Sequence, residues 1–379
     1  MRIASHLKSF LPILLIVAAG CRHATPTTEV AGERLRVGFF VGAGSNGPNV
    51  INLGRLLAHS PQVELTLLDG KDVRAGQLEG KNLLVIPGGS SATQYKEMQE
   101  AGAEAIRNFV SNGGSYFGVC AGFHCALNRD ERIRLLPYTW YFGGNGMRAT
   151  LNVELNEKAA ERLQVPAGKY QVRYSRGPVS RRCEQPGTGW AEELAVYKDT
   201  MAWPKITFDG APAMLYGEYG KGKVIATSFH PEYFVTTHPI ALGCVYAVTG
   251  VKITPVFPKK RRNPIRVAYL SNGMTGKPWV KQCLELDRQA DIDLQVTSTF
   301  SEGILEHVDV VVCPHPSPQT SKSILGPADK PPLKDFLDNG GKVLIAKSAK
   351  SLAIKHGNVA FYSGDSDVVA AVRKAAMPH

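Results

Sequence analysis

Short runs of β-branched, aromatic and aliphatic residues recur along the chain, and each is followed by a loop rich in Gly or Asn. Arg36–Phe40 is the first such run, and Arg266–Leu270 begins a second series. Runs of this kind are typical of the first buried strand of an α/β sheet. The pattern therefore predicts two α/β units, one after the other.

The second series repeats the first at a constant spacing. Leu83–Pro87 corresponds to Val310–Pro314, and Ile106–Gly114 corresponds to Leu333–Gly341, in both cases 227 residues further on. Each longer segment predicts a helix that ends in Asn-Gly-Gly, which lets the chain leave the helix and enter the next strand. Strand, helix and strand joined by right-handed crossovers predict a doubly wound parallel sheet in each unit.

These elements define the expected domains. We expect a first α/β domain over residues 35–254 and a second, of similar topology, over residues 265–379. Residues 255–264 are rich in Pro, Lys and Arg and are expected to be a linker between the two domains.

Composition agrees with a globular chain and limits its partners. The 379 residues are 44% hydrophobic and 20% charged, which supplies enough apolar material for a core. The formal net charge is +11, but the only dense basic run, Lys259–Arg262, stands beside prolines. We interpret that run as a solvated linker and expect no nucleic-acid partner. No run of 18 or more apolar residues is present, so the sequence predicts no ordinary spanning helix.

The first residues resemble a bacterial lipoprotein signal. Arg2 and Lys8 give a positive start, Phe10–Ala19 is a short apolar stretch, and Ala18–Cys21 follows as the cleavage region. The resemblance implies that residues 1–20 are removed, that Cys21 is lipidated, and that residues 21–34 are a polar tether. We therefore expect an extracytoplasmic protein anchored to a bacterial membrane by lipid, with the leaflet left open. An ordinary secretory signal with an incidental Cys21 is the alternative.

A candidate nucleophile lies after the strand Ser115–Val119. Gly118–Gly122 reads Gly-Val-Cys-Ala-Gly, the cysteine counterpart of the Gly-x-Ser-x-Gly elbow, in which glycines allow a tight strand-to-helix turn. The thiol of Cys120 would lie at a helix N-terminus, where the dipole favours the thiolate. The alternative is a buried structural cysteine, which is how we interpret Cys125.

A candidate base lies 110 residues downstream. Gly220–Lys223 is a turn, Val224–Phe229 is a predicted strand, and His230-Pro231-Glu232 follows it. The Glu232 carboxylate is well spaced to accept one ring N–H of His230 while the other ring nitrogen serves Cys120. The alternative for this tripeptide is the solvated end of a strand.

Three further segments flank these residues. The amides of Gly88 and Gly89, in a Gly-rich turn after a predicted strand, are candidates for an oxyanion hole together with the amide of Ala121. The aromatic run Trp140–Phe142 is expected to pack in the core, with a pocket wall as the alternative. Asp130–Arg132 is expected to be a solvated helix end.

Together these motifs resemble the class I glutamine amidotransferase superfamily, and most of all the amidotransferase-like biotin-protein ligase N-terminal domain, over about residues 35–250. The resemblance implies a flavodoxin-like fold and a Cys-His-Glu triad, here Cys120, His230 and Glu232, whose thiol attacks an amide carbonyl. It also implies that substrate contacts a further group of side chains and loop residues, namely Tyr95, His124, Arg176 and Gly177.

Two departures limit what the resemblance implies. His124 stands where many glutaminases carry Gln, which puts glutamine in doubt as the substrate. Nothing in the chain resembles the biotinoyl-adenylate loop, so we do not expect a biotin ligase.

In the second unit, Lys347 stands at the position of Cys120, and His315-Pro316 at the position of Gly88-Gly89. Proline has no N–H and lysine is no thiol nucleophile, so this unit is interpreted as a degenerate repeat.

The sequence thus supports three hypotheses. The first is a lipid-anchored cysteine amidohydrolase that acts on a small amide or peptide. The second is a non-catalytic module that binds such a ligand, and the third is an envelope protein whose second domain recruits a partner that the sequence does not identify. We expect neither a cofactor nor a metal, because the seven cysteines form no C-x-x-C pair and no His/Asp cluster has metal-ligand spacing.

Overall fold

The computed structural model contains two α/β sheets within one compact unit, Arg34–His379. The residues that it describes are 33–379 except 144–146, 184–188, 200–201, 204–205, 272–273, 301–302, 315–328, 348–353, 355, 364–366 and 378–379. The proposed signal peptide and Cys21 lie outside the described residues, as does nearly all of the tether. No helix in the described part of the chain has the length and apolar character needed to cross a membrane.

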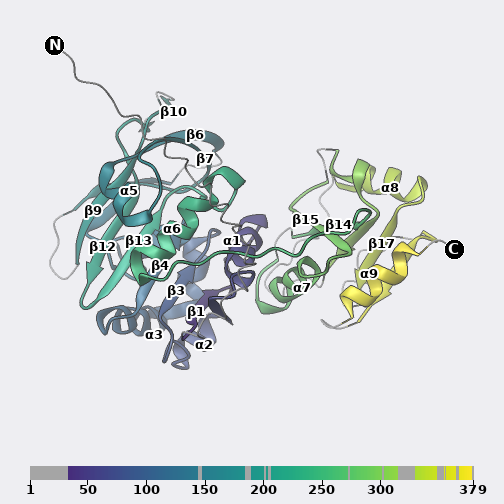
Figure 1. Ribbon diagram of the computed structural model, residues 1–379, viewed down its shortest axis with the longest axis horizontal. Helices are drawn as coiled ribbons and strands as arrows, with labels where there is room; N and C mark the ends of the chain where they lie inside the picture. Colours follow the sequence, from purple (N-terminus) through teal and green to yellow (C-terminus); the bar gives the residue numbers. More distant parts are fainter. Residues whose placement is uncertain are drawn as a thin grey trace, which may run out of the picture. The chain divides into compact units, whose positions relative to one another are not determined.

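The first sheet has nine strands among the described residues, in the order β2-β1-β3-β4-β13-β12-β9-β6-β7 (Figure 1). Its parallel part consists of β1 (Leu35–Phe40), β2 (Val63–Leu68), β3 (Leu83–Ile86), β4 (Ser115–Val119) and β13 (Gly222–Thr227). An antiparallel extension consists of β12 (Pro212–Tyr219), β9 (Trp190–Tyr197), β6 (Arg148–Leu155) and β7 (Gly168–Ser175). The parallel part confirms the predicted flavodoxin-like α/β fold, whereas the extension has no counterpart in the sequence analysis.

Helices cover both faces of the first sheet. One face packs on α1 (Pro48–Ala58) and α6 (His238–Thr249), and the other packs on α2 (Gly70–Arg74), α3 (Ser91–Ser111) and α4 (Ala121–Ala126). Strands such as β3 are buried over their whole length because both faces are covered, which explains their uninterrupted apolar sequence. The remaining short elements are α5 (Glu157–Leu163), η1 (Val235–Thr237) and two ribbons, β5 (Tyr138–Gly143) with β8 (Pro178–Arg182) and β10 (Ala202–Trp203) with β11 (Ile206–Thr207).

The second sheet repeats the strand order of the parallel part of the first. Its order is β15-β14-β16-β17-β18, and every neighbouring pair is parallel. The strands are β14 (Ile265–Leu270), β15 (Ile292–Thr297), β16 (Val310–Cys313), β17 (Lys342–Ala346) and β18 (Val359–Tyr362). The helical segments are α7 (Lys277–Asp287), η2 (Ile304–His307), α8 (Lys330–Asp338) and α9 (Val368–Ala376). The sequence segments that recur at a spacing of 227 residues therefore occupy equivalent places in two sheets of the same strand order.

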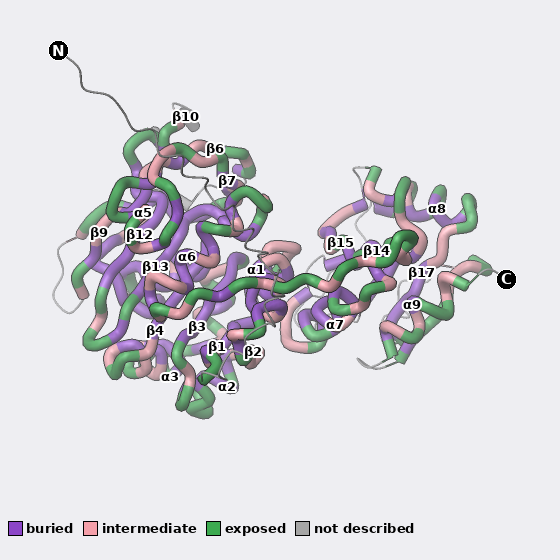
Figure 2. Tube along the Cα trace, viewed as in Figure 1, coloured by how far each residue is buried: buried purple, intermediate pink, exposed green. Residues whose placement is uncertain are grey.

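The segment between the two sheets has no helix or strand. Residues 251–264 run in an irregular, largely exposed path, drawn in pink and green in Figure 2. Nearby, the buried carboxylate of Asp287 on α7 accepts hydrogen bonds from two side chains of the α1 region. These are the guanidinium group of Arg55 and the ring nitrogen Nε2 of His59, the latter at 2.7 Å. Burial opposes the charge of Asp287, but these two partners outweigh it and hold its pKa below the usual value.

Candidate active site

Cys120 lies at the point where β4 turns into α4. Its backbone has φ 53° and ψ −97°, a left-handed φ that a non-Gly residue adopts only under local constraint. The Cys120 amide donates to the carbonyl oxygen of Thr227 at 2.7 Å, which fixes the turn against the end of β13. A Cβ atom at position 122 would overlap the carbonyl oxygen of Ile86. The glycine of the motif is therefore required by the close packing of α4 on β3.

His230 and Glu232 form a buried pair next to this turn. Since β13 runs parallel to β4, with Thr227 opposite Val119, the residues after β13 reach the same edge of the sheet as Cys120. Nδ1 of His230 lies 2.7 Å from Oε1 of Glu232, and the two residues are 2% and 1% exposed. Burial opposes the charge on His230, but Glu232 and Cys120 outweigh it and raise its pKa to about 10.

The turn after β3 completes the immediate surroundings of the thiol. A Cβ atom at Gly88 would lie 2.6 Å from Cε1 of His230 and 3.5 Å from Cβ of Cys120. Gly89 pairs with Ser45 in an isolated bridge, so this turn is held by the loop that follows β1. Ala121 is the first residue of α4, so its N–H has no carbonyl one turn back in the helix. The geometry thus brings Gly88 to the candidate nucleophile and base.

The last residue of β7, Ser175, lies next to Cys120. The thiol of Cys120 donates to the carbonyl oxygen of Ser175 at 3.4 Å, and Cys120 is only 4% exposed. Arg176 has a left-handed φ of 61°, and a Cβ at Gly177 would overlap the carbonyl oxygen of Ser228. The contact with the thiol is made by the backbone of Ser175, which the sequence analysis missed, and the predicted substrate contacts of Arg176 and Gly177 stay predictions.

His124 lies one helical turn after Cys120 and is held neutral. Its Nδ1 accepts a hydrogen bond from Nε of Arg132 at 3.0 Å, and its ring lies 5.0 Å from that of Trp140. Burial, followed by the charges of Arg132 and Arg129, lowers the pKa of His124 to about 3. The prediction of a solvated helix end was wrong for Arg132, which is 9% exposed, because its guanidinium group packs on His124. The sequence could not predict this contact, because a spacing of eight residues between His124 and Arg132 across an irregular segment corresponds to no regular motif.

Tyr95 is directed to a different set of side chains. Its hydroxyl donates to Oε2 of Glu100 at 2.5 Å, and Glu100 is also bound by Arg107. Burial and the Glu100 carboxylate raise the pKa of Tyr95 to about 12. The structure therefore groups Tyr95 with Glu100, and its predicted contact with substrate stays a prediction.

None of the cysteines in the described part of the chain takes part in a disulfide. The free thiols are Cys120, Cys125, Cys183, Cys244, Cys283 and Cys313. In the second unit, Lys347 directly follows β17 and is exposed, whereas the predicted counterparts of the glycine turn, His315 and Pro316, lie outside the described residues.

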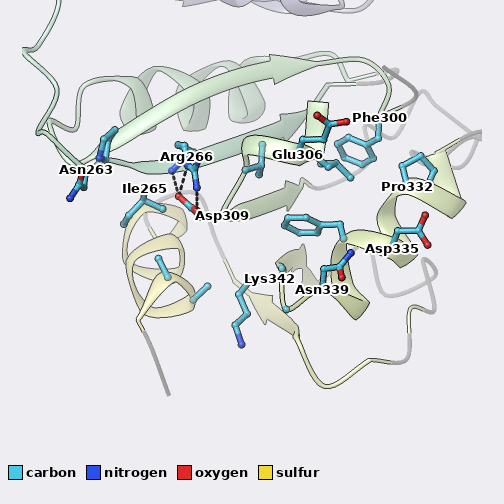
Figure 3. Close-up of a pocket in the computed structure, with 18 of the residues that line it drawn as sticks. Asn263, Ile265, Arg266, Phe300, Glu306, Asp309, Pro332, Asp335, Asn339 and Lys342 are labelled. Atoms are coloured by element: carbon cyan, nitrogen blue, oxygen red, sulfur yellow. Dashed lines mark hydrogen bonds and ion pairs between the residues drawn. The ribbon is translucent and has the colours of Figure 1, made fainter. Parts of the chain in front are cut away.

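A cavity of about 1250 Å³ lies away from this chemistry, at the amino ends of the second sheet's strands. Its lining includes Arg266, Phe300, Asp309 and Lys342 (Figure 3). Arg266 and Asp309 neutralise each other through paired hydrogen bonds, and none of the described residues that line the cavity is a cysteine or a histidine. Cavity volume alone therefore does not locate the candidate active site, which we place around Cys120.

Comparison with known proteins finds a family match over part of this region. The family described as "Biotin-protein ligase, N terminal" matches residues 77–131, which include the turn after β3 and the Cys120 elbow. A biotin–protein ligase of Schizosaccharomyces pombe is 27% identical over 246 residues, 58% of this chain and 38% of that enzyme.

Several subunits of pyridoxal 5'-phosphate synthase named PdxT match over most of their length. The subunit of Moorella thermoacetica is 28% identical over 184 residues, 47% of this chain and 87% of that subunit. A subunit of Thermus thermophilus is 31% identical over 185 residues, 47% of this chain and 85% of that subunit. The chain therefore belongs to the class I glutamine amidotransferase-like family that includes these PdxT subunits.

Proposed function

We propose that the chain is a cysteine-dependent amidohydrolase that acts on a small amide or peptide. Cys120 is the nucleophile, His230 is the base and then the acid, and Glu232 orients the ring of His230. The observation that carries the proposal is the buried hydrogen bond of 2.7 Å between His230 and Glu232, beside a cysteine in a strained elbow. Next to a thiol, a buried imidazole–carboxylate pair of this kind can act as a general base, with the carboxylate orienting the ring.

The proposed reaction has two stages. His230 accepts the proton of the Cys120 thiol, and the raised pKa of His230 favours this transfer. The sulfur attacks the amide carbon and forms a C–S bond, while the amides of Gly88 and Ala121 receive the developing oxyanion. His230 donates its proton to the leaving nitrogen as the C–N bond breaks. A water molecule, deprotonated by His230, then attacks the thioester, the C–S bond breaks, and an acid and the free thiol result.

Labelling with a chloroketone analogue of glutamine tests the nucleophile. The full chain is treated at pH 7.5, and the modified peptide is located by mass spectrometry. We expect Cys120 to be labelled and Cys120→Ser to lose both the label and amide hydrolysis. Cys125 is the matched control in the same helix, because burial raises its pKa to about 12 and keeps it a thiol. Labelling of Cys120 no faster than Cys125 would contradict the proposal.

A second candidate function is ligand binding without turnover. The observation that favours it is the cover over Cys120, a residue that is 4% exposed and whose thiol is bonded to the carbonyl oxygen of Ser175. Calorimetric titration of wild type and Cys120→Ser with glutamine and short peptide amides separates the two functions. Saturable heat of binding, unchanged by Cys120→Ser and accompanied by no ammonia release, would favour the binding module.

The proposed location depends on Cys21, for which the comparisons supply no test. Lipidation at Cys21 would anchor the protein to a bacterial membrane on the extracytoplasmic side. Metabolic labelling with palmitate in a bacterial host tests this proposal. We expect the wild-type chain to be labelled and recovered with membranes, and Cys21→Ser to be neither. Equal labelling of both chains would overturn the anchor.

A further inference from the structure

The loop that follows β1 is buried, which is unusual for a connection between a strand and a helix. All five of its residues from Val41 to Ser45 are buried, whereas most loops run over the surface, where water satisfies their backbone polar groups. The polar groups of this loop therefore need partners elsewhere in the protein. Those partners include the turn after β3 on one side and the start of the second α/β unit on the other.

The loop fixes the glycine turn through its backbone and through one side chain. The amide of Ser90 donates to the carbonyl oxygen of Gly44 at 2.8 Å. Nε2 of Gln94, a fully buried residue, donates to Oγ of Ser45 at 3.2 Å and to the carbonyl oxygen of Pro87 at 3.1 Å. The backbone on both sides of the oxyanion-hole candidate is thus bound to this loop, so a displacement of the loop would move the turn.

The carboxylate of Glu97 on α3 holds the middle of the loop. Its Oε2 accepts a hydrogen bond from the amide of Ala43 at 2.6 Å, and the amide of Gly70 also donates to this carboxylate. A Cβ atom at Gly42 would overlap the same carboxylate, which shows how closely the loop packs on it. Burial raises the pKa of Glu97, and the two amides counteract part of that rise. Glu97 therefore joins the loop to the start of α2.

The second α/β unit also binds this region, through the residues that begin α7. The amide of Gly276 donates to the carbonyl oxygen of Val41 at 2.7 Å. Nζ of Lys277 lies 3.3 Å from Oδ2 of Asp69 and makes an ion pair with Asp72. The second unit thus contacts the loop directly and also contacts the acidic residues of α2.

The α2 helix connects the Lys277 ion pairs to Glu97. Its residues Asp69 and Asp72 accept each other's amide in a capping box, and α2 begins at Gly70 between them. A Cβ atom at Gly70 would lie 2.6 Å from the carbonyl oxygen of Glu97, so the start of α2 packs directly on α3. The path from the second unit to the loop therefore consists of charge-assisted hydrogen bonds and close backbone contacts.

We propose that Lys277 and Glu97 are positioning residues for the oxyanion hole, through which the second α/β unit holds the Gly88 amide beside Cys120. The inference rests on the proposed function and gives the second unit a part in it. Neither residue touches the substrate. Each acts through the loop after β1, whose packed contacts form the continuous path that such coupling uses.

Two reagents that use the Cys120 thiol differently test the proposal. With p-nitrophenyl acetate, an S–C bond forms at the carbonyl carbon, an oxyanion develops, and p-nitrophenolate leaves. With iodoacetamide, an S–C bond forms by direct displacement, iodide leaves, and no oxyanion develops. The ratio of acylation to alkylation rates therefore reports the oxyanion hole separately from the reactivity of the thiol. In the full chain at neutral pH, acylation is measured as p-nitrophenolate release above that of Cys120→Ser, and alkylation by mass spectrometry of the Cys120 peptide.

Two variants each interrupt the path at one point. Lys277→Met removes the charge and keeps the length of the side chain, and Glu97→Gln keeps the shape but replaces one acceptor oxygen. We expect each to lower the acylation-to-alkylation ratio about tenfold, less than the roughly 10²–10³-fold loss that follows removal of a whole oxyanion-hole donor. Lys277→Arg retains the ion pairs and should retain the ratio. Lys281→Met is the matched control, because Lys281 is exposed one turn further along the same helix, and it should also retain the ratio.

The double variant tests whether the two residues act along one path. Two effects on one path are not additive, so Lys277→Met combined with Glu97→Gln should lower the ratio about tenfold, as each single variant does. Independent effects would multiply to about 100-fold and would contradict the shared path. Thermal unfolding of every variant confirms that the proteins compared are folded.

Each contrary result has a distinct meaning. If Cys120 reacts with both reagents but Lys277→Met and Glu97→Gln keep the wild-type ratio, the positioning role is overturned and the proposed function stands. Equal losses of acylation and alkylation in folded variants contradict a specific effect on the oxyanion hole. A ratio lowered as much by Lys281→Met assigns the effect to lost positive charge and overturns the path. If Cys120 reacts with neither reagent faster than Cys125 does, the proposed function fails, and the inference fails with it.

Discussion

The buried pair of His230 and Glu232 makes a quantitative prediction about stability and pH. Burial by itself would lower the pKa of His230, but Glu232 and Cys120 raise it to about 10. A histidine in an unfolded chain titrates near 6.5. Between these two values the folded protein retains a proton that the unfolded chain has released. Glu232→Gln removes the carboxylate and keeps the size of the side chain, so the neutral ring should be the stable form in that variant.

The size of the effect follows from the shift. At about 1.4 kcal/mol per pKa unit, the shift of His230 corresponds to roughly 5 kcal/mol of stabilisation. Because the folded pKa is raised, this contribution is fully present below pH 6.5 and is lost as pH rises through about 10. The free energy of unfolding of the wild type should exceed that of Glu232→Gln most at about pH 6. The difference should shrink with pH by up to about 1.4 kcal/mol per unit.

Urea unfolding followed by circular dichroism, at half-unit steps from pH 6 to pH 9.5, measures this difference. Glu154→Gln is the control, because Glu154 makes an exposed ion pair with Lys198 at 3.3 Å, which contributes little. Burial keeps thiols such as Cys125 protonated in the folded state, and they ionise only in the unfolded chain of both proteins, so their effect cancels in the comparison. Wild type and Glu232→Gln losing stability in parallel across the interval would refute a charged His230 in the folded state.

Two further predictions concern the scaffold. Gly122→Ala should destabilise the protein by about 3 kcal/mol or prevent folding, because the added Cβ would overlap the backbone of β3. Gly357→Ala is the control, because the space around Gly357 is open, and it should leave the free energy of unfolding unchanged in the same urea assay. Asp287→Ala should cost about 3 kcal/mol, because it leaves the Arg55 guanidinium group and the His59 ring without their shared buried partner. Asp309→Ala, at an exposed pair, should cost less than about 1 kcal/mol. Equal costs for the two Asp variants would contradict the role given to burial.

The sequence predicted the parallel parts of both sheets because their strands are buried on both faces. Strands such as β3 and β16 are apolar at every position, so their signal does not depend on context. The antiparallel extension, in contrast, was not predicted. Strand β6 alternates exposed and buried positions, and its place depends on long-range pairing with β7 and β9.

The residues of the candidate triad could also be predicted from the sequence, because they lie in short local motifs. Gly118–Gly122 and His230–Glu232 each lie within a few residues of a strand end, where local spacing fixes backbone direction. That both segments lie at one edge follows from β4 and β13 being parallel neighbours in the sheet. The chemical roles of the triad residues stay predictions until the labelling experiment is done.

The sequence by itself determined two α/β units at a fixed spacing and a cysteine elbow in only one of them. Only the tertiary structure decided what surrounds that cysteine. The Ser175 carbonyl next to the thiol and the Arg132 guanidinium group on His124 come from segments with no common sequence pattern. The physical reason is that strand and elbow motifs are set by local backbone geometry. Burial and hydrogen-bond partners are set by which distant segments pack together.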